Sequence, residues 1–319
     1  MKWRTASALA VIALVWGSAW IPTSDVLKEV PALSAGAVRF AIAAAFTSFF
    51  ALIARHRAGR TTNRISPTLF LHALILSIAA LALPYALIVW ASGEASPAAV
   101  PVLFAFMPLA AFLLGREVVS TAIPALVVGI GGVALLVAQG LSISRAQLKP
   151  VCLITCAVLL GAFSLNYAKK HLRTSDLLPS SAVQFAVAAV LLGVISAAAR
   201  RGQSLSWSRW DRGTLLSLSI LGVAVSSVTL PLMYWLVTRL ETWQVATLQW
   251  TSTLVSVAEA AWFLRAKPSL EQGVGAVLII GATAWLLGNR SLDYEAVTPK
   301  ATDSTIEVST ASESEVGSK

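Results

Sequence analysis

A row of polar side chains interrupts an apolar stretch in the last third of the sequence. Four residues follow one another at spacings of 3, 4 and 3, which places them on one helix face: Gln249, Ser252, Ser256 and Glu259. Trp250 flanks the row. An amide, two hydroxyls and a carboxylate can hydrogen-bond a polar solute or water. Either these residues line an aqueous path, as we expect, or they form a polar seam between packed helices.

Two prolines with nearby tyrosines mark two other apolar stretches. Pro84 directly precedes Tyr85, and Pro231 lies three residues before Tyr234. A proline removes one backbone donor and opens a helix locally, which frees a carbonyl for a solute or for water. The prolines are therefore candidate hinges, with packing kinks as the alternative, and the tyrosines are candidate cavity residues.

Aromatic, amide and cationic side chains add further candidates. Trp16 and Trp20 lie one helical turn apart, and toward a cavity they would offer flat surfaces and a cation–π partner. The alternative is an interfacial aromatic belt, which suits Trp20 better than the deeper Trp16. Asn166 could hydrogen-bond a carboxylate or an amino group, or else join a helix contact. Arg39 could snorkel to the interface or attract a carboxylate.

The composition indicates that lipid surrounds the elements carrying these residues. Hydrophobic residues make up 57% of the 319 and charged residues 12%, whereas soluble domains average about half apolar and about a quarter charged. The net charge of +9 comes from short basic clusters between apolar runs. Such clusters are typical of loops that flank membrane helices. We therefore expect a lipid bilayer as a partner, and no nucleic acid.

The apolar runs predict an all-α polytopic membrane protein with ten transmembrane helices. About 20 apolar residues cross the hydrocarbon core as a helix, and ten segments come close to that length: 6–27, 33–54, 68–91, 95–114, 118–138, 150–168, 180–199, 214–238, 242–264 and 270–288. The runs are continuous, not alternating, so helices are preferred to a barrel. Residues 289–319 are rich in Ser, Thr and acids, which predicts a disordered polar tail.

Loop charge predicts the orientation. With the N-terminus inside, Arg4 and the basic cluster at 55–64 lie in the cytoplasm, and Lys28 lies outside. The second half disagrees in part, because Arg200 and Arg212 would also lie outside. The first helices usually dominate, so we expect both termini to be cytoplasmic.

The sequence also repeats itself weakly. Leu83-Pro84-Tyr85 returns as Leu230-Pro231-Leu232-Met233-Tyr234, and Val38-Arg39-Phe40 returns as Val183-Gln184-Phe185. The offsets of these two echoes, 145 and 147 residues, are about half the length of the membrane portion. Because five is odd, a repeated five-helix unit inserts in the opposite sense the second time. We therefore expect two inverted five-helix repeats (5+5), at 1–140 and 150–288, with the binding site between them.

Several of these residues resemble a known family. Trp16-Gly17-Ser18-Ala19-Trp20, Arg39-Phe40 and Pro108 resemble an EamA-type unit of the drug/metabolite transporter superfamily, and the second half resembles a degenerate second unit. Thr247-Leu248-Gln249-Trp250 is similar to the corresponding part of YddG-type exporters. The resemblance implies an inner (plasma) membrane carrier for aromatic and other amino acids.

These observations favour a secondary transporter of small metabolites, most simply a monomeric amino-acid exporter that works by facilitated alternating access. An enzyme is disfavoured, because no H-E-x-x-H motif and no nucleophile–base pair at depth is found. Cys152 and Cys156 are read as small residues at a helix contact, so no metal and no cofactor are expected. A proton-coupled exporter of drugs or other small metabolites, an intramembrane enzyme and a channel remain the alternatives.

Overall fold

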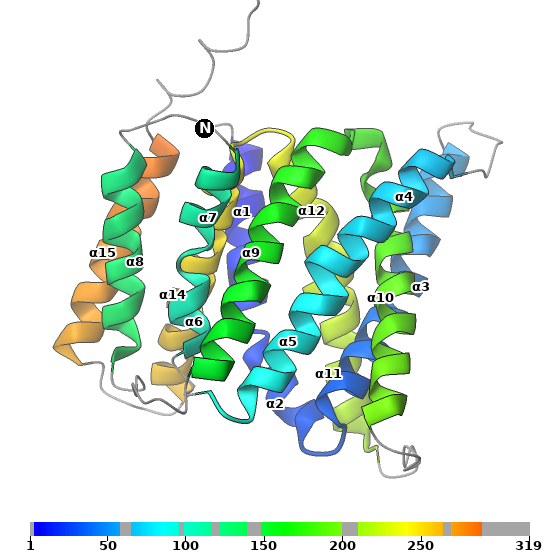
Figure 1. The fold of residues 1–319 in the computed structure, drawn as a ribbon, viewed down its shortest axis with the longest axis horizontal. Helices are drawn as coiled ribbons and strands as arrows, with labels where there is room; N and C mark the ends of the chain where they lie inside the picture. Colours follow the sequence, from blue (N-terminus) through cyan, green and yellow to red (C-terminus); the bar gives the residue numbers. More distant parts are fainter. Residues whose placement is uncertain are drawn as a thin grey trace, which may run out of the picture. The chain divides into compact units, whose positions relative to one another are not determined.

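The computed structural model describes residues 3–57, 65–95, 99–115, 122–138, 148–199, 210–263 and 269–288, and these residues form helices without any strand (Figure 1). The predicted tail at 289–319 lies outside the described residues. The helices of the first half are α1 (Trp3–Gly17), α2 (Trp20–Leu27), α3 (Ala32–Arg57), α4 (Pro67–Leu76), η1 (Ser77–Ala82), α5 (Leu83–Ser92), α6 (Ala99–Phe104), α7 (Met107–Gly115) and α8 (Ala122–Leu136). Those of the second half are α9 (Leu148–His171), η4 (Thr174–Asp176), α10 (Leu177–Ala199), α11 (Arg212–Gly222), η6 (Val223–Val228), α12 (Thr229–Val237), α13 (Thr242–Ala246), α14 (Leu248–Phe263) and α15 (Leu270–Gly288).

Many of these helices suit a bilayer. Seven helical segments within the described ranges are long and apolar enough to cross a membrane: Trp3–Leu27, Ala32–Arg57, Pro67–Ser92, Leu148–His171, Leu177–Ala199, Arg212–Val237 and Leu270–Leu287. At about 1.5 Å per residue, 26 helical residues reach about 39 Å, which exceeds the roughly 30 Å of hydrocarbon. Shorter apolar helices occupy Val100–Gly115 and Ala122–Leu136. The prediction of a polytopic all-α membrane protein is therefore confirmed.

The two halves share an unusual helical feature. The π-helix η1 separates α4 from α5 just before Pro84, and the π-helix η6 separates α11 from α12 just before Pro231. Proline cannot donate to the carbonyl four residues back and its ring crowds that carbonyl. The wider π turn, with its i to i+5 hydrogen bonds, accommodates this: the N–H of Leu83 donates to the carbonyl of Ile78. Both predicted hinge prolines therefore lie at an irregular turn of a long helix.

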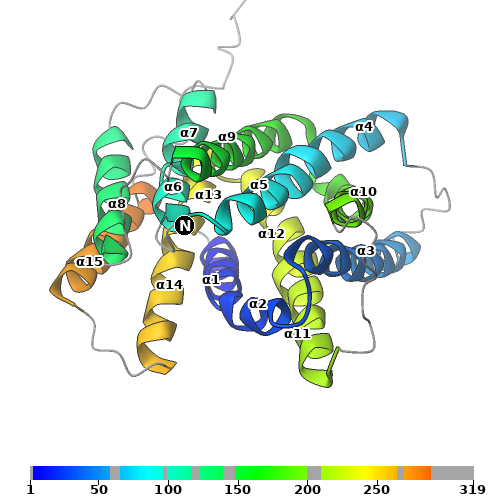
Figure 2. The same cartoon turned by 60° about the horizontal axis from the view of Figure 1, so that its bottom comes forward.

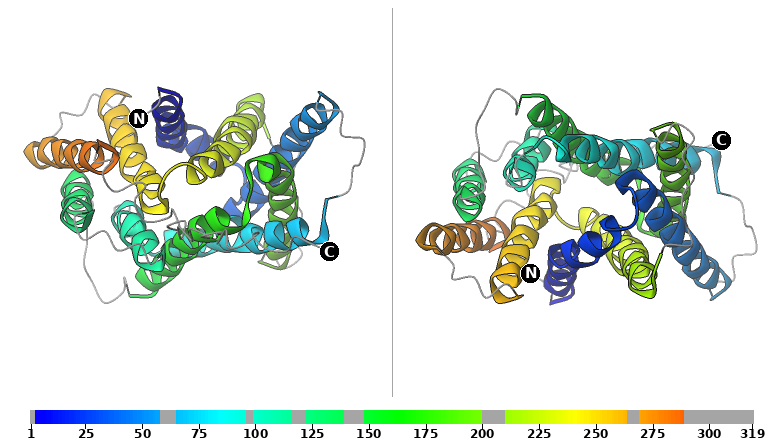
Figure 3. Two further views of the ribbon diagram at one scale, coloured as in Figure 1. Left: turned by 90° about the horizontal axis from the view of Figure 1, so that it is seen from above. Right: turned by 90° about the horizontal axis from the view of Figure 1, so that it is seen from below.

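Corresponding helices of the two halves pack against each other. α3 lies along α10, and α8 lies along α15, as the labelled view of Figure 2 shows. Figure 3, which looks along the helices from both ends, shows the orange α15 beside the green α8. Two further contacts are also equivalent in the two halves. α1 of the first half packs on α14 of the second, and α9, which corresponds to α1, packs on α7, which corresponds to α14. A repeated unit is expected to make such contacts, in which each helix of one half packs on the same helix of the other half as its counterpart does.

Glycines allow one of these pairs to come very close. A Cβ atom on Gly132 of α8 would lie 2.9 Å from the carbonyl oxygen of Gly275, and a Cβ on Gly275 would lie 2.5 Å from that of Gly132. Both distances are too short for any side chain. The two backbones therefore touch directly, as small residues permit in membrane helices.

Candidate functional site

A cavity of about 170 Å³ lies between the two halves. Its wall combines the first half and the second half, and its residues include Trp16 (α1), Pro84 (α5), Phe104 (α6), Met107 (α7), Ser164 (α9), Met233 (α12) and Gln249 (α14). We call it the central cavity. At about 30 Å³ per water molecule, it holds roughly five or six waters, which is room for part of a small solute. Three predicted residues, Trp16, Pro84 and Gln249, line it.

Gln249 supplies the free polar group of this wall. Its backbone carbonyl accepts hydrogen bonds from the hydroxyls of Ser252 (3.1 Å) and Thr253 (2.8 Å). Its carboxamide, by contrast, has no hydrogen-bond partner among the described residues. A half-buried amide that faces an apolar cavity without a partner is able to donate to and accept from a solute.

Trp16 supplies a fixed aromatic surface on the same wall. Its indole Nε1 donates to the hydroxyl of Thr229 over 2.8 Å, and this bond sets the orientation of the half-buried ring. The hydrogen bond joins α1 of the first half to α12 of the second. The neighbouring tryptophan, Trp20, begins α2, is 36% exposed and does not line the central cavity.

The other members of the polar row contact α1. The Ser256 hydroxyl donates to the carbonyl of Gly17 over 2.7 Å, and Ser252 is 5% exposed with its hydroxyl bonded within its own helix. Glu259 accepts a hydrogen bond from Ser18 through Oε1, while its Oε2 is buried without a partner in the described part of the chain. The row therefore divides into a cavity residue, Gln249, and a seam between α14 and α1.

Tyr234 and Trp250 lie in helix contacts. The Tyr234 hydroxyl donates to Oε1 of Gln184 over 2.8 Å, and both side chains are buried. The Trp250 indole donates to the carbonyl of Ala105 over 2.9 Å, and its ring packs on Gly129. The Tyr234 contact lies within the second half, the Trp250 contacts join the two halves, and neither side chain lines the central cavity.

Asn166 and Tyr85 also have protein partners. Asn166 donates to the carbonyl of Ala111 over 3.0 Å and accepts from the Thr242 hydroxyl over 2.9 Å. Tyr85 donates to the carbonyl of Ala32 over 3.1 Å. For Asn166 the structure shows the helix contact that the sequence left open as an alternative. Pro231 is half-buried at the start of α12, and of the two hinge prolines only Pro84 reaches the central cavity.

Sequence reasoning missed a set of contacts on η6. Two hydroxyl residues at the end of η6 and the first residue of α12 each bond a side chain of the first half, and we call these pairs the η6 contacts: Ser226 with Arg39 (2.7 Å), Ser227 with Thr47 (2.6 Å) and Thr229 with Trp16 (2.8 Å). The available signal was the hydroxyl-rich run at 226–229 inside an apolar span. It was informative because polar groups in a membrane core need partners.

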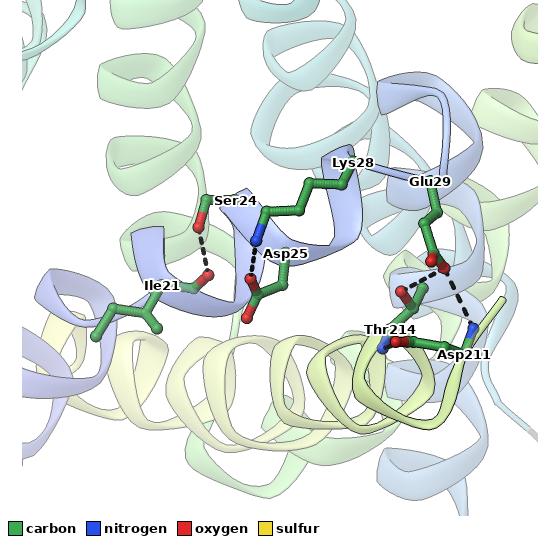
Figure 4. Close-up of polar contacts among 7 residues, drawn as sticks. All are labelled: Ile21, Ser24, Asp25, Lys28, Glu29, Asp211 and Thr214. Carbon is green, nitrogen blue, oxygen red and sulfur yellow. Dashed lines mark hydrogen bonds and ion pairs between the residues drawn. The ribbon is translucent and has the colours of Figure 1, made fainter.

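A second cavity lies near the end of the bundle opposite the start of α1. It measures about 440 Å³, is open, and lies between α1–α2 and α11–η6, with Ser18, Asp25 and Ser217 among its lining residues. Glu29, which follows α2 in the chain, ties this segment to the start of α11. Its Oε2 accepts from the backbone N–H of Asp211 (3.2 Å) and from the hydroxyl of Thr214 (2.7 Å) (Figure 4).

The helix start at this tie is itself capped. The Asp211 carboxylate accepts the backbone N–H of Thr214 over 2.6 Å, and this hydrogen bond holds the pKa of Asp211 below its usual range. Nearby, Lys28 pairs with Asp25 over 2.7 Å, which raises the pKa of Lys28. Anionic groups at a helix N-terminus satisfy otherwise free N–H groups, so Glu29 and Asp211 stabilise the same terminus.

The end at which α1 starts carries its own polar contacts, and the one between His72 and Tyr167 joins the two halves. His72 of α4 pairs through Nδ1 with the Tyr167 hydroxyl of α9 over 2.8 Å, and His171 stacks on Tyr167. Lys169 forms an ion pair with Glu241 just before α13. The central cavity thus lies between two sets of polar contacts, one toward each end of the bundle.

The chain is similar to known proteins along nearly its whole membrane portion. The EamA-like transporter family matches residues 3–138 and again residues 148–288. Among solved structures, one titled "Crystal structure of protein" superposes with a TM-score of 0.72 at 17% identity, over 92% of this chain and 100% of that one, which shows a shared fold. A search of the curated proteins gives no match. The chain therefore belongs to the EamA-like transporter family of the drug/metabolite transporter superfamily, whose members are multi-pass membrane transporters of small molecules.

Proposed function

We propose that this protein exports amino acids, aromatic ones included, across the plasma membrane by facilitated alternating access. The observation that carries the proposal is the central cavity, whose wall joins both halves and presents the Trp16 ring and the free Gln249 carboxamide. In this proposal ten spans form two inverted five-helix repeats, at 1–140 and 150–288, within a monomer whose termini are both cytoplasmic. Inverted repeats with a binding site at their interface are typical of secondary transporters.

The chemistry of the cavity supports a small solute of low net charge. Aromatic and thioether groups from Trp16, Phe104, Met107 and Met233 form an apolar surface, and Gln249 adds one amide. No charged side chain lines this cavity among the described residues. Apolar walls with few polar groups bind apolar side chains and fix their orientation, which suits an amino acid better than a phosphorylated metabolite.

The contacts at the two ends of the bundle support alternating access. Opening one end requires the tie between Glu29 and Thr214 to break, and opening the other requires His72 and Tyr167 to separate. The π turns before Pro84 and Pro231 are the places where long helices bend at low cost. Rocking of one half against the other around the central cavity would break one set of contacts while the other set remains.

Counterflow in liposomes tests the transport function. Purified protein preloaded with one unlabelled amino acid is expected to take up the same labelled amino acid transiently and saturably. Nucleosides and sugars in the same panel are expected to compete at least tenfold more weakly, because the cavity offers them a single amide. An ohmic current would indicate a channel instead, and a panel in which no amino acid competes would defeat the proposal.

Glu259 raises proton coupling as the second candidate, because its Oε2 is buried and has no partner among the described residues. Under the facilitated mechanism Glu259→Gln keeps the hydrogen bond from Ser18, so counterflow is expected to stay within about threefold of wild type. A pH gradient alone is expected to drive no accumulation in either protein. If the gradient does drive accumulation and Glu259→Gln abolishes it, proton coupling replaces facilitated transport.

A further inference from the structure

Arg39 is an incompletely bonded cation inside the helix bundle. It lies in α3, within a segment able to cross the membrane, and its side chain is half-buried. The Nε of its guanidinium donates to Ser226 of η6 over 2.7 Å, so the side chain turns toward η6 instead of extending to an interface. This contact settles the choice between snorkelling and an inward position that the sequence left open.

The hydrogen bond to Ser226 leaves most of the guanidinium unused. Arginine has five N–H groups, and Nε–H is the one with a protein acceptor in the described part of the chain. The Cζ atom also lies 5.6 Å from the centre of the Phe40 ring. No described carboxylate pairs with this cation. A charged group at such depth is unfavourable unless it is hydrated or paired.

The corresponding residue of the second half has a protein partner at both its amide nitrogen and its amide oxygen. Gln184 is 0% exposed, its Nε2 donates to Ser180 over 2.9 Å, and its Oε1 accepts from Tyr234 over 2.8 Å. A neutral amide with two protein partners completes a helix contact. The cation at the equivalent place has its outer N–H groups left over, and these groups are not among the fully buried atoms that lack a partner. Accessible space therefore adjoins them.

The η6 contacts connect Arg39 to the central cavity. Ser226 holds Arg39, and Thr229, three residues later, holds Trp16, whose ring lines the cavity. Three helical residues rise about 4.5 Å along the axis, which is comparable to the length of an amino-acid backbone. A solute whose side chain lies against Trp16 can therefore extend an acidic group toward Arg39.

We propose that Arg39 binds the carboxylate of the transported solute, which makes the substrate class α-amino acids or other small monocarboxylates. This inference rests on the proposed transport function and deepens it. The outer Nη1 and Nη2 groups of a guanidinium match the two oxygens of one carboxylate, and such a pair is both strong and directional. Ser226 holds Nε and so keeps the outer groups directed away from η6.

Competition in counterflow tests the proposal. The probe is the labelled amino acid with the strongest counterflow, and the competitors are the same amino acid, its carboxamide and the corresponding amine without a carboxyl group. In the wild type the amino acid is expected to inhibit counterflow at a concentration about tenfold or more below that of either analogue, because each analogue lacks the charge-assisted pair with Arg39. Arg39→Gln is expected to bring that ratio close to one.

Arg57→Gln is the matched control, because it removes an equal charge from the exposed end of the same helix. It is expected to keep the wild-type ratio. If Arg39→Gln does not purify as a single species, Arg39→Lys replaces it. Lysine keeps the charge but binds as a point donor, so the ratio is expected to fall between those of the wild type and unity. An unchanged ratio in the Arg39 variant overturns the proposal.

A binding measurement separates this proposal from the transport function. The melting temperature of detergent-purified protein is recorded with 3-phenylpropionate, with its amide and with inorganic phosphate. A rise with the carboxylate alone, present in Arg57→Gln and lost in Arg39→Gln, supports the Arg39 site even if no amino acid shows counterflow. Equal rises with carboxylate and amide, or a larger rise with phosphate, would refute it.

Discussion

Replacing Gly132 with valine is expected to separate α8 from α15 and to destabilise the protein by about 3 kcal/mol. A Cβ atom at this position lies 2.9 Å from the Gly275 carbonyl oxygen and 3.1 Å from the backbone nitrogen of Ile279. Both neighbours are backbone atoms, which cannot turn away as a side chain would. The helices must therefore move apart along their whole contact, and packing contacts are what hold membrane helices together.

The adjacent glycine provides the control. A Cβ atom on Gly131 meets nothing within 4 Å, so Gly131→Val introduces an equal change in helix propensity without the clash. We expect Gly131→Val to remain monodisperse in detergent with a melting temperature within a few degrees of wild type. Gly132→Val should melt far lower or aggregate. Equal melting temperatures for the two variants would show that α8 and α15 are not in backbone contact.

Replacing Gln249 with leucine is expected to lower the transport efficiency, kcat/KM, by about tenfold or more. The carboxamide faces the central cavity and has no protein partner among the described residues. A hydrogen bond from this group to the solute would contribute about 1–3 kcal/mol once the solute is desolvated. Leucine keeps a similar volume and the apolar stem, so the cavity should keep its shape while it loses its amide.

The melting temperature distinguishes this loss from a folding defect. Because the Gln249 carboxamide bonds no described residue, Gln249→Leu is expected to melt at or above the wild-type temperature. Thr251→Val on the same helix serves as the control, since the Thr251 hydroxyl has the carbonyl of Leu248 as its one partner among the described residues. That variant should transport normally. Normal transport by Gln249→Leu would exclude the carboxamide from solute binding.

The sequence was sufficient for the class of protein and for the position of its irregular turns. Long continuous apolar runs form helices in a bilayer, because every backbone N–H and C=O group must be hydrogen-bonded within the segment. The echo of Leu83-Pro84 in Leu230-Pro231 correctly indicated related positions, and both now lie after a π-helix. Proline acts on the backbone of its own helix, so its effect can be inferred locally.

The direction of individual polar side chains was less predictable. Helical spacing shows that Gln249, Ser252 and Ser256 share a face, but it does not say which neighbour that face meets. In the structure Ser252 bonds to its own helix and Ser256 bonds to α1. Short hydroxyl side chains find carbonyls within reach, whereas a longer amide extends past them into the cavity. Partners more than a hundred residues away, such as Ser226 for Arg39, depend on packing that no local pattern encodes.

The hydroxyl groups of η6 also make the two halves chemically unequal. When Pro84 is aligned with Pro231, the positions of η1 that correspond to Ser226 and Ser227 carry Ala79 and Ala80. Two copies of the first half, assembled in place of the fused chain, would present each Arg39 and each Thr47 to an alanine. The two halves share a π-helix before a proline, but their side chains at this turn differ and, in the second half, complement those of the first. A pair of identical first halves would therefore lack the hydroxyl partners that Ser226 and Ser227 supply to Arg39 and Thr47 in this chain.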